Sequence, residues 1–306
     1  MKSGWVFNTL ILCFCVFFLP AAVAEDEDAV WRENGWNFVD ASMDVSRGIP
    51  ESASGALERI RIAGELRVAT EPYVPPQEFI DPALAGQEQY AGADMKLAAL
   101  IAKRMGVALE IVPMEFSEVL ESVTEGECDL AVSALSYTPA RASAVTLSKG
   151  YYFGDEGLSA GLLIREEEAG SILSLRDLSG RTIVAQSGSV QEALLADGVP
   201  DYREFRRLSS AQECYEAVAA GWADAAAVNV DAANAYIAKN RNCGLTLASG
   251  VVFRQEPQFE GDRIAARKGE TQLIAFVNGV IDEVLKQDLY TDWYRESAER
   301  AAELGL

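Results

Sequence analysis

Two short segments of the sequence carry the pattern expected of an anion-binding helix start. In the first, Thr138 and Pro139 suit the N-cap and first-turn positions of a helix, and Arg141 follows within that turn. A cation there opposes the helix dipole, so the arrangement costs stability unless an anion is also present. A bound carboxylate would resolve this, because it could accept two parallel guanidinium hydrogen bonds and further donors around Ser136. An ordinary solvated arginine is the alternative for this segment taken alone.

The second segment spans residues 186–192. Ser189 and Glu192 have the spacing of a capping box, and Gly188 lacks the β-carbon that would block a ligand from the backbone N–H groups. One such segment lies in each half of the chain. We therefore expect a ligand held between two domains, with both helix starts facing the same carboxylate.

The overall composition excludes several other functions. The 306 residues include 26 Lys and Arg, 47 Asp and Glu, and no histidine, so the formal net charge is −21. Without histidine there is no Ser-His-Asp or Cys-His nucleophile and no imidazole metal ligand. The negative charge would repel nucleic-acid phosphates, so no nucleic-acid partner is expected. The sequence has neither a Gly-x-Gly-x-x-Gly motif nor a P-loop, and we expect no cofactor and no metal.

The five cysteines do not form a disulfide framework. Cys13 and Cys15 lie in the apolar N-terminal stretch, and Cys128, Cys214 and Cys243 remain at irregular spacing. No pair has the C-x-x-C spacing of a zinc site. A bridge between Cys214 and Cys243, or three buried thiols, are the two alternatives.

The N-terminal residues predict export from the cytoplasm. A lysine near the start precedes an apolar stretch over residues 5–24, which ends in the small-residue series 22–24. This pattern is typical of a secretory signal peptide, residues 1–24, cleaved after Ala24. A retained membrane anchor is the alternative, because the stretch is almost long enough to span a bilayer. We expect a periplasmic protein whose residues 25–52 form an N-terminal extension packed on the body.

Hydrophobic periodicity predicts alternating strands and helices, which implies βαβ units and parallel sheets. Asp94 can cap a helix over residues 94–105, and Gly106 ends it. The expected strands cover residues 66–70, 108–113, 129–133, 158–164, 181–185 and 224–228. The expected helices cover residues 56–64, 94–105, 116–125, 189–196, 210–220, 231–239, 271–286 and 289–303.

From about residue 66 to residue 294, three quarters of its length, the sequence resembles the family 3 periplasmic solute-binding proteins. The stretches that carry the resemblance are GELRVATEP (64–72), GADM (92–95), SYTPAR (136–141), QSGS (186–189) and IAARKG (264–269). Each stretch alone is weakly specific, and their order and spacing give the resemblance its weight. Members of the family typically bind polar amino acids for ABC importers.

The resemblance implies an α/β chain with the two-lobe periplasmic binding protein type II fold. Each lobe would be a mostly parallel sheet flanked by helices, and two hinge crossings would join the lobes, which close on the ligand. Lobe 1 would comprise residues 53–156 and the C-terminal helices within 262–306, and lobe 2 residues 157–261.

The resemblance also implies how the pocket would hold an amino acid. Arg141 would bind the α-carboxylate with help from Ser136 and Ser189. Ser133 and Ala134 would offer backbone carbonyls to the ammonium.

Three further positions match the family pocket. Phe116 matches the aromatic residue that lines it, although a core aromatic at helical spacing explains this residue as well. Gly188 belongs to the second anion contact, and Gln191 lies beside that contact.

The departures from the family pattern concern the ligand side chain and the ammonium. Val74 stands where the family usually has a stacking aromatic residue, with Tyr73 one place early, and Asn229 replaces the aspartate that binds the ammonium. A buried ammonium needs a counter-charge, and Glu71 would be the only nearby anion. Asp231 would cap its helix or face solvent. These changes leave room for a weakened amino-acid site or for a carboxylate ligand without a free ammonium.

We therefore expect a monomeric binding protein, not an enzyme, that captures an amino acid or related carboxylate for an inner-membrane ABC permease. A cyclohexadienyl dehydratase is the enzymatic alternative, because that enzyme resembles this family and would use a cleft carboxylate such as Glu71 as an acid. A ligand-binding sensory module is a third alternative. No receptor domain follows Leu306, so such a module would signal in trans.

Overall fold

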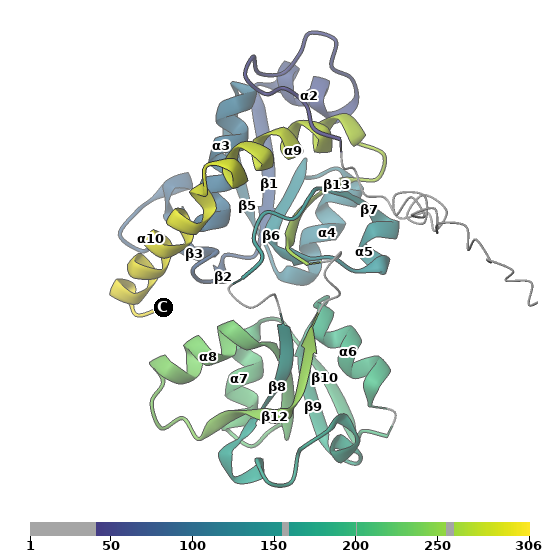
Figure 1. Ribbon diagram of the computed structural model, residues 1–306, viewed down its shortest axis with the longest axis vertical. Coiled ribbons are helices and arrows are strands. Elements are labelled where there is room, and N and C mark those ends of the chain that lie inside the picture. Colours follow the sequence, from purple (N-terminus) through teal and green to yellow (C-terminus); the bar gives the residue numbers. More distant parts are fainter. Residues whose placement is uncertain (1–40, 155–158, 200, 255–259) are drawn as a thin grey trace, which may run out of the picture. The chain divides into compact units, whose positions relative to one another are not determined.

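Two five-stranded sheets, each covered by helices on both faces, form the two lobes of the chain (Figure 1). The structure is a computed structural model that describes residues 41–154, 159–199, 201–254 and 260–306. The predicted signal peptide and residues 25–40 of the extension lie outside the described residues. No helix among the described residues is both long and apolar enough to cross a membrane.

The first sheet has the order β5-β1-β6-β13-β7. Its strands β1, β5 and β6 are parallel, whereas β13 runs antiparallel to both β6 and β7. The strands are β1 (Glu65–Thr70), β5 (Ala108–Pro113), β6 (Leu130–Ser136), β7 (Val145–Leu147) and β13 (Asp262–Arg267). A small antiparallel sheet adds β2 (Tyr73–Val74), β3 (Glu78–Ile80) and β4 (Tyr90–Ala91).

Successive side chains along the strands of the first sheet pack into two separate cores, one on each face, as the two-residue period of a strand requires. Leu66 and Val68 of β1 pack into the larger core, whereas Ala69 packs into the core on the other face. The larger core includes residues of α2 (Gly55–Ala63), α3 (Ala93–Met105), α9 (Thr271–Lys286) and α10 (Leu289–Leu304). The other core includes residues of α4 (Phe116–Glu125) and α5 (Pro139–Ala144).

The second sheet has the order β10-β9-β11-β8-β12. Strands β9, β10 and β11 are parallel, and β8 runs antiparallel to both β11 and β12. Its strands are β8 (Ser159–Arg165), β9 (Thr182–Gln186), β10 (Glu204–Leu208), β11 (Ala225–Asn229) and β12 (Leu245–Arg254). Helix α6 (Val190–Gly198) covers one face, and α7 (Ala211–Ala219) and α8 (Val230–Lys239) cover the other.

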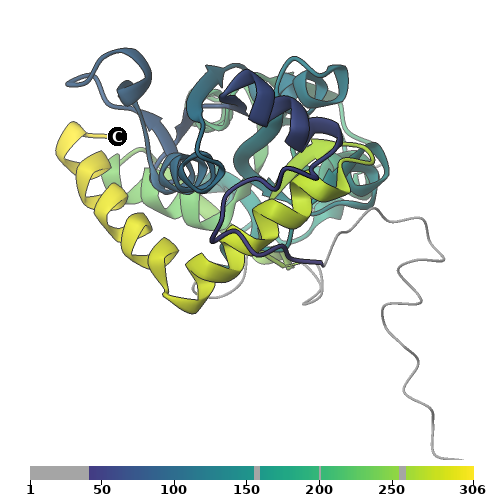
Figure 2. The same ribbon diagram turned by 90° about the horizontal axis from the view of Figure 1, so that it is seen from above.

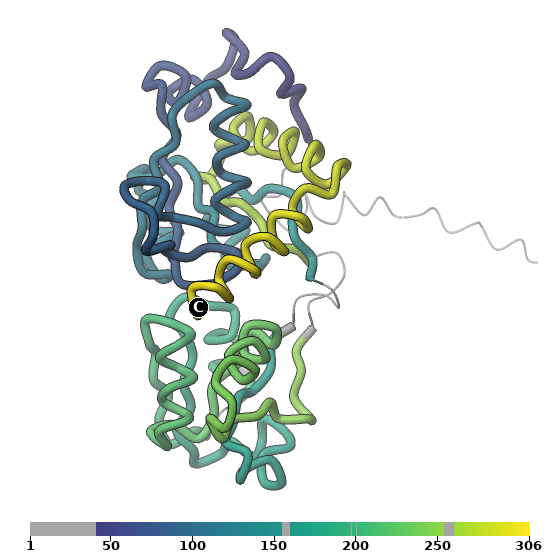
Figure 3. The backbone as a smooth tube through the Cα atoms, turned by 90° about the vertical axis from the view of Figure 1, so that its left-hand side faces the viewer, coloured from purple at the N-terminus to yellow at the C-terminus, as the bar shows by residue number. Residues whose placement is uncertain are grey.

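The chain enters the second lobe between β7 and β8 and returns between β12 and β13, so both chain ends of the body belong to the first lobe (Figure 3). This arrangement confirms the predicted α/β two-lobe class. The mostly parallel sheets were predicted, but each lobe also contains antiparallel strands where the chain crosses over. The domain boundaries at 156/157 and 261/262 stay predictions, because residues 155–158 and 255–259 lie outside the described residues.

The described part of the predicted extension packs on α9, as Figure 2 shows. The Met43 N–H donates to the Ala275 carbonyl at 2.9 Å, and Val45 is buried in the larger core. A β-carbon on Gly279 would lie only 2.1 Å from the Met43 carbonyl oxygen, so the segment lies directly on the helix. The described residues 41–52 thus belong to a segment that contacts the body, whereas the predicted extension as a whole, residues 25–52, stays a prediction.

Candidate functional site

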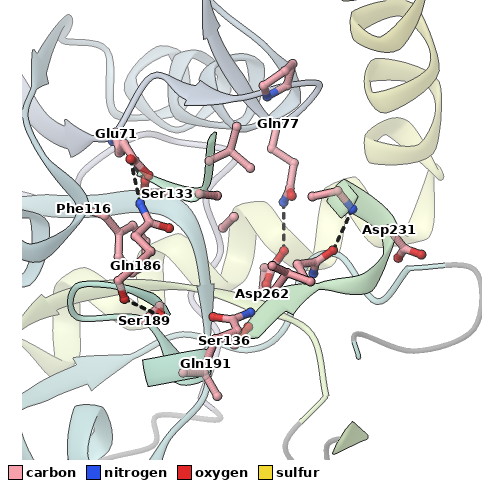
Figure 4. Close-up of a pocket in the computed structure, with 18 of the residues that line it drawn as sticks. Glu71, Gln77, Phe116, Ser133, Ser136, Gln186, Ser189, Gln191, Asp231 and Asp262 are labelled. Atoms are coloured by element: carbon pink, nitrogen blue, oxygen red, sulfur yellow. Dashed lines mark hydrogen bonds between the residues drawn. The ribbon is translucent and has the colours of Figure 1, made fainter. Parts of the chain in front are cut away.

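A pocket lies between the two lobes and is lined by residues of both (Figure 4). Its volume is about 140 Å³, which is room for roughly ten waters or for a small solute that displaces them. Nine of the eleven predicted site residues line this pocket. They are Glu71, Phe116, Ser133, Ala134, Ser136, Arg141, Ser189, Gln191 and Asn229.

Tyr73 and Gly188 are the two predicted residues that do not line the pocket. Tyr73 is 65% exposed, because successive residues of a strand face opposite sides and its neighbour Val74 is the one that faces the pocket. Gly188 was expected to open backbone N–H groups to the ligand, but its N–H donates to the Glu192 carboxylate at 2.8 Å. Gly188 instead has a φ of 75°, and a β-carbon there would lie 3.2 Å from Ser117 Cα of the first lobe.

Arg141 is held inside the pocket by the end of β6 and the short helix α5. Thr138 caps α5, because its hydroxyl accepts the Arg141 N–H at 3.0 Å, and Pro139 is the first helical residue, as predicted. Arg141 is 7% exposed, and its guanidinium donates to the carbonyls of Ser136 at 2.7 Å and Gly188 at 3.1 Å. The predicted Thr138 cap is therefore confirmed.

The Arg141 side chain keeps donors for a ligand. Two of the five guanidinium N–H groups are used by the carbonyls above, and within the described residues Arg141 forms no ion pair at 4.0 Å or less. The Phe116 ring lies 5.5 Å from its guanidinium carbon, in a cation–π contact. Burial lowers the pKa of Arg141 to about 10, and the charge of Asp262 opposes that shift. The cation is thus present at neutral pH without direct neutralisation by a neighbour.

Glu71 follows β1 and is 2% exposed at the opposite side of the pocket from Asp262 (Figure 4). Its Oε1 accepts a hydrogen bond from the amide of Gln186, in the second lobe, at 2.7 Å. Its Oε2 is buried and has no hydrogen-bond partner within the described part of the chain. Burial raises the pKa of Glu71 to about 7, although the Gln186 hydrogen bond acts in the opposite direction.

Asp262 is a second buried carboxylate in the pocket, which sequence reasoning missed. It begins β13, is 2% exposed, and accepts a hydrogen bond from the Gln77 amide at 2.8 Å (Figure 4). Burial and the nearby charge of Asp94 raise the pKa of Asp262 to about 7, and Gln77, Arg141 and Ser136 oppose that rise. The expectation that Glu71 is the only anion near the ligand is therefore wrong.

Two more acidic residues lie behind the pocket and position it. Asp94 was predicted to cap α3, but the N-cap of this helix is Gly92. Instead, Asp94 is fully buried, accepts the Ala134 N–H at 3.0 Å, and accepts the hydroxyl of Tyr151 at 2.8 Å. Burial raises the pKa of Asp94, and it raises the pKa of the neighbouring Glu78 far above its usual range. These bonds fix the Ala134 backbone, whose φ of 45° turns the chain at the end of β6.

The second lobe contributes neutral groups at the starts of two helices. Ser189 caps α6, since its hydroxyl accepts the Glu192 N–H at 3.1 Å, as the capping-box spacing predicts. Asn229 caps α8, because its Oδ1 accepts the Ala232 N–H at 3.0 Å. Asp231 was predicted to cap this helix or face solvent; it is not the cap, and it lies exposed at the pocket edge.

Several other pocket residues carried no signal in the sequence. Tyr152 and Tyr294 stack at a centroid distance of 4.7 Å and line the pocket, Tyr152 from the segment that follows β7 and Tyr294 from α10. Gln77 follows a Pro-Pro pair and gives no pattern of its own. Asp262 was the exception, because an acidic residue directly after Gly261 and just before the apolar residues 264–266 was a usable signal.

The two predicted alternatives for the cysteines are resolved within the described residues. Cys128, Cys214 and Cys243 are free thiols, so Cys214 and Cys243 form no bridge. Cys128 and Cys214 are buried, whereas Cys243 is partly exposed. No group of three or more Cys, Asp or Glu side chains in the described ranges is arranged to hold a metal ion.

Comparison with known proteins identifies similar sequences and structures. Residues 66–296 match the family of bacterial extracellular solute-binding proteins, family 3. The arginine-binding extracellular protein ArtP of Bacillus subtilis strain 168 is 30% identical over 115 residues, which is 38% of this chain and 43% of that protein. The L-cystine-binding protein TcyJ of Escherichia coli strain K12 is 25% identical over 244 residues, 78% of this chain and 86% of that protein.

The fold is shared with a solved binding protein. An amino acid ABC transporter substrate-binding protein of Streptococcus pneumoniae, bound to L-arginine, superposes with a TM-score of 0.69 and 27% sequence identity. The match covers 80% of this chain and 98% of that one. All residues that line the pocket lie within the matched family region, whereas the segment before residue 66, which includes α2, and the end of α10 lie outside it.

Proposed function

We propose, from the premise that this chain belongs to family 3 of the bacterial extracellular solute-binding proteins, that it captures an amino acid between its lobes. It would act in the periplasm as a monomer and deliver the solute to an inner-membrane ABC permease. The observation that carries this proposal is the Arg141 guanidinium, which is buried in the pocket and has no carboxylate partner within 4.0 Å among the described residues. A buried cation of this kind is stabilised by a bound carboxylate.

The charges of the pocket support a solute with positive groups as well as a carboxylate. Among the described lining residues, Arg141 is the one basic side chain, whereas Glu71, Asp231 and Asp262 are acidic. A ligand with a single carboxylate and no cation would satisfy Arg141 and leave Glu71 and Asp262 buried without a counter-charge. Zwitterionic or cationic amino acids fit better, which agrees with the arginine and cystine named for the relatives.

A thermal-shift and calorimetric screen tests the proposal. The purified protein is measured with the protein L-amino acids, L-ornithine, L-cystine and simple carboxylates. At a hundredfold excess over its dissociation constant, a true ligand should stabilise the fold by about 2.7 kcal/mol. Arg141→Ala should remove the stabilisation. Arg59→Ala is the matched control, because Arg59 pairs with Glu270 on the surface and its side chain is 59% exposed. A screen in which no amino acid binds the wild-type protein would overturn the proposal.

The raised pKa of Glu71 favours a dehydratase as a second candidate function. A carboxylic acid with a pKa near 7 is protonated in about half of the molecules at neutral pH, and that form can donate its proton to a leaving hydroxyl group. In that reaction prephenate would lose water and carbon dioxide to give phenylpyruvate, with its carboxylate held by Arg141. Incubation with prephenate and detection of phenylpyruvate tests this candidate, and the absence of product with folded protein rejects it.

A further inference from the structure

The proposed amino-acid site lacks an evident partner for the ligand's ammonium group. Asn229 stands at the position where the resemblance implies an aspartate, and it is neutral. Its Oδ1 is already engaged by the Ala232 N–H, as the cap of α8. An ammonium removed from water without a counter-charge is strongly destabilised. Another carboxylate must therefore take this role if the ligand is an amino acid.

The partner for the ammonium must lie close to Arg141. The carboxylate and ammonium of an α-amino acid sit on one carbon atom, so the groups that bind them must be neighbours. Glu71 is engaged by Gln186, and its pKa is shifted by burial, Gln186 and Glu115 rather than by the charge of Arg141, whereas Asp231 is exposed on α8. Neither residue is both buried and electrostatically coupled to Arg141, whereas Asp262 and Arg141 each influence the pKa of the other.

Asp262 satisfies both conditions. In the antiparallel pairing of β13 with β6, Asp262 lies directly opposite Ser136, whose carbonyl accepts the Arg141 guanidinium at 2.7 Å. The Ser136 hydroxyl and the Gln77 amide both donate to the Asp262 carboxylate, which fixes its orientation toward the pocket (Figure 4). Asp262 and Arg141 interact electrostatically, but they form no ion pair at 4.0 Å or less among the described residues. A zwitterion can therefore lie between the two charges.

We infer that Asp262 is the counter-charge for the α-ammonium of the bound amino acid, in place of the residue at position 229. Gln77 and Ser136 act as positioning residues, because they hold the carboxylate through hydrogen bonds. This inference rests on the proposed function and adds to it, since it restricts the ligands to those with a free amino group next to the carboxylate. The bound solute would be recognised as a zwitterion by two charges that line the same pocket, Arg141 on α5 and Asp262 at the start of β13.

A cycle of ligand and protein changes tests the inference by isothermal titration calorimetry at pH 8. The probes are L-arginine and 5-guanidinopentanoate, which is the same molecule without the α-amino group. If the screen finds another amino acid, that acid and its 2-deamino carboxylate replace them. The wild-type protein should prefer the amino acid. Asp262→Asn should weaken amino-acid binding by roughly 10- to 100-fold and should change binding of the deamino acid by less than about threefold.

Two variants distinguish this role from the alternatives. Asp201→Asn is the matched control, because it removes an exposed carboxylate of the second lobe that does not line the pocket, and it should leave the preference unchanged. Glu71→Gln tests whether Glu71 is the counter-charge instead. If this variant abolishes the preference for the amino acid over the deamino acid and Asp262→Asn does not, the inference is wrong. A merely structural Asp262 would weaken both probes equally, and that result also overturns it.

A variant of the positioning residue Gln77 keeps the test valid if Asp262→Asn does not fold. Gln77→Met removes the 2.8 Å hydrogen bond to Asp262 and keeps the carboxylate, so it should give a smaller loss, roughly threefold to tenfold, confined to the amino acid. Equal loss for both probes contradicts the inference. Failure of this inference is distinguishable from failure of the proposed function, because the latter would show as a wild-type protein that binds no amino acid at all.

Discussion

The two lobes contribute different kinds of group to the same pocket. The first lobe supplies the buried charges Arg141, Glu71 and Asp262, all 7% exposed or less. The second lobe supplies the neutral side chains of Ser189, Gln191 and Asn229 and the amide of Gln186, and its one lining carboxylate, Asp231, is exposed.

This difference suggests different roles for the lobes in the proposed binding of a ligand. The first lobe would bind the charged groups of the ligand, and the second would close over it with polar groups that need no counter-ion. Buried charges are costly to bring together from two moving bodies, because each must lose water before it gains its partner. Placing them in one lobe fixes their spacing before the ligand arrives.

The largest effect expected from this comparison is a pH dependence caused by the first lobe alone. Glu71 and Asp262 both have pKa values raised to about 7 in the folded protein, so between pH 4 and pH 7 the folded state binds more protons than the unfolded state. The free energy of unfolding of the ligand-free protein should therefore fall as the pH rises through this window.

Substitution of either residue measures this effect. Glu71→Gln or Asp262→Asn should stabilise the ligand-free protein at pH 8 by roughly 3 kcal/mol and should flatten part of the pH dependence. Urea denaturation at pH 5 and pH 8 provides the measurement. Asp231→Asn, which changes the second lobe, is expected to have no comparable effect. Equal stability at both pH values would show that neither carboxyl group is perturbed.

An intermediate effect is expected where the second lobe contacts the first through its backbone. Gly188→Ala introduces a β-carbon at a φ of 75° and 3.2 Å from Ser117 Cα, which should destabilise the protein by about 1 to 2 kcal/mol. It should also weaken ligand binding, because the new methyl group opposes closure. Gly170→Ala is the control, since its φ is not positive and a β-carbon there has no neighbour within 4 Å. A Gly188 variant as stable and as tightly binding as the control would show that this contact is unimportant.

The smallest effect is expected from a charge placed in the second lobe. Asn229→Asp keeps the helix cap, because aspartate accepts the Ala232 N–H as well as asparagine does. With Asp262 already facing the ammonium, amino-acid affinity at pH 8 should change by less than about threefold, or less than about 0.7 kcal/mol. A much larger gain by calorimetry would mean that the ammonium lies at position 229 and that the two lobes share the charges.

Much of the fold could be predicted from the sequence because its signals are local. The helices over 116–125 and 271–286 have the predicted bounds, and the predicted caps Thr138 and Ser189 are observed. The short strands of the small sheet and the edge strand β10 were missed, because two- and three-residue strands and a polar edge strand give little periodicity.

Site residues within a local sequence motif could be predicted, whereas residues that reach the site through pairing between distant strands could not. Arg141, Ser136 and Ser189 lie in recognisable helix starts, and all three line the pocket. Asp262 is 121 positions from Arg141 in sequence (262 − 141), and only the β6–β13 register brings it opposite Ser136. Asp94 was misread for a similar reason, since its partners Tyr151 and Tyr290 come from distant segments.

The central claim to test is that Arg141 binds the α-carboxylate of the ligand. The affinity of the tightest-binding L-amino acid is compared with that of its α-carboxamide, for the wild-type protein and for Arg141→Ala, by calorimetry at pH 8. We predict that the wild-type protein prefers the acid by roughly 10- to 100-fold and that Arg141→Ala binds both weakly and without preference. An undiminished preference for the acid in Arg141→Ala would contradict the account.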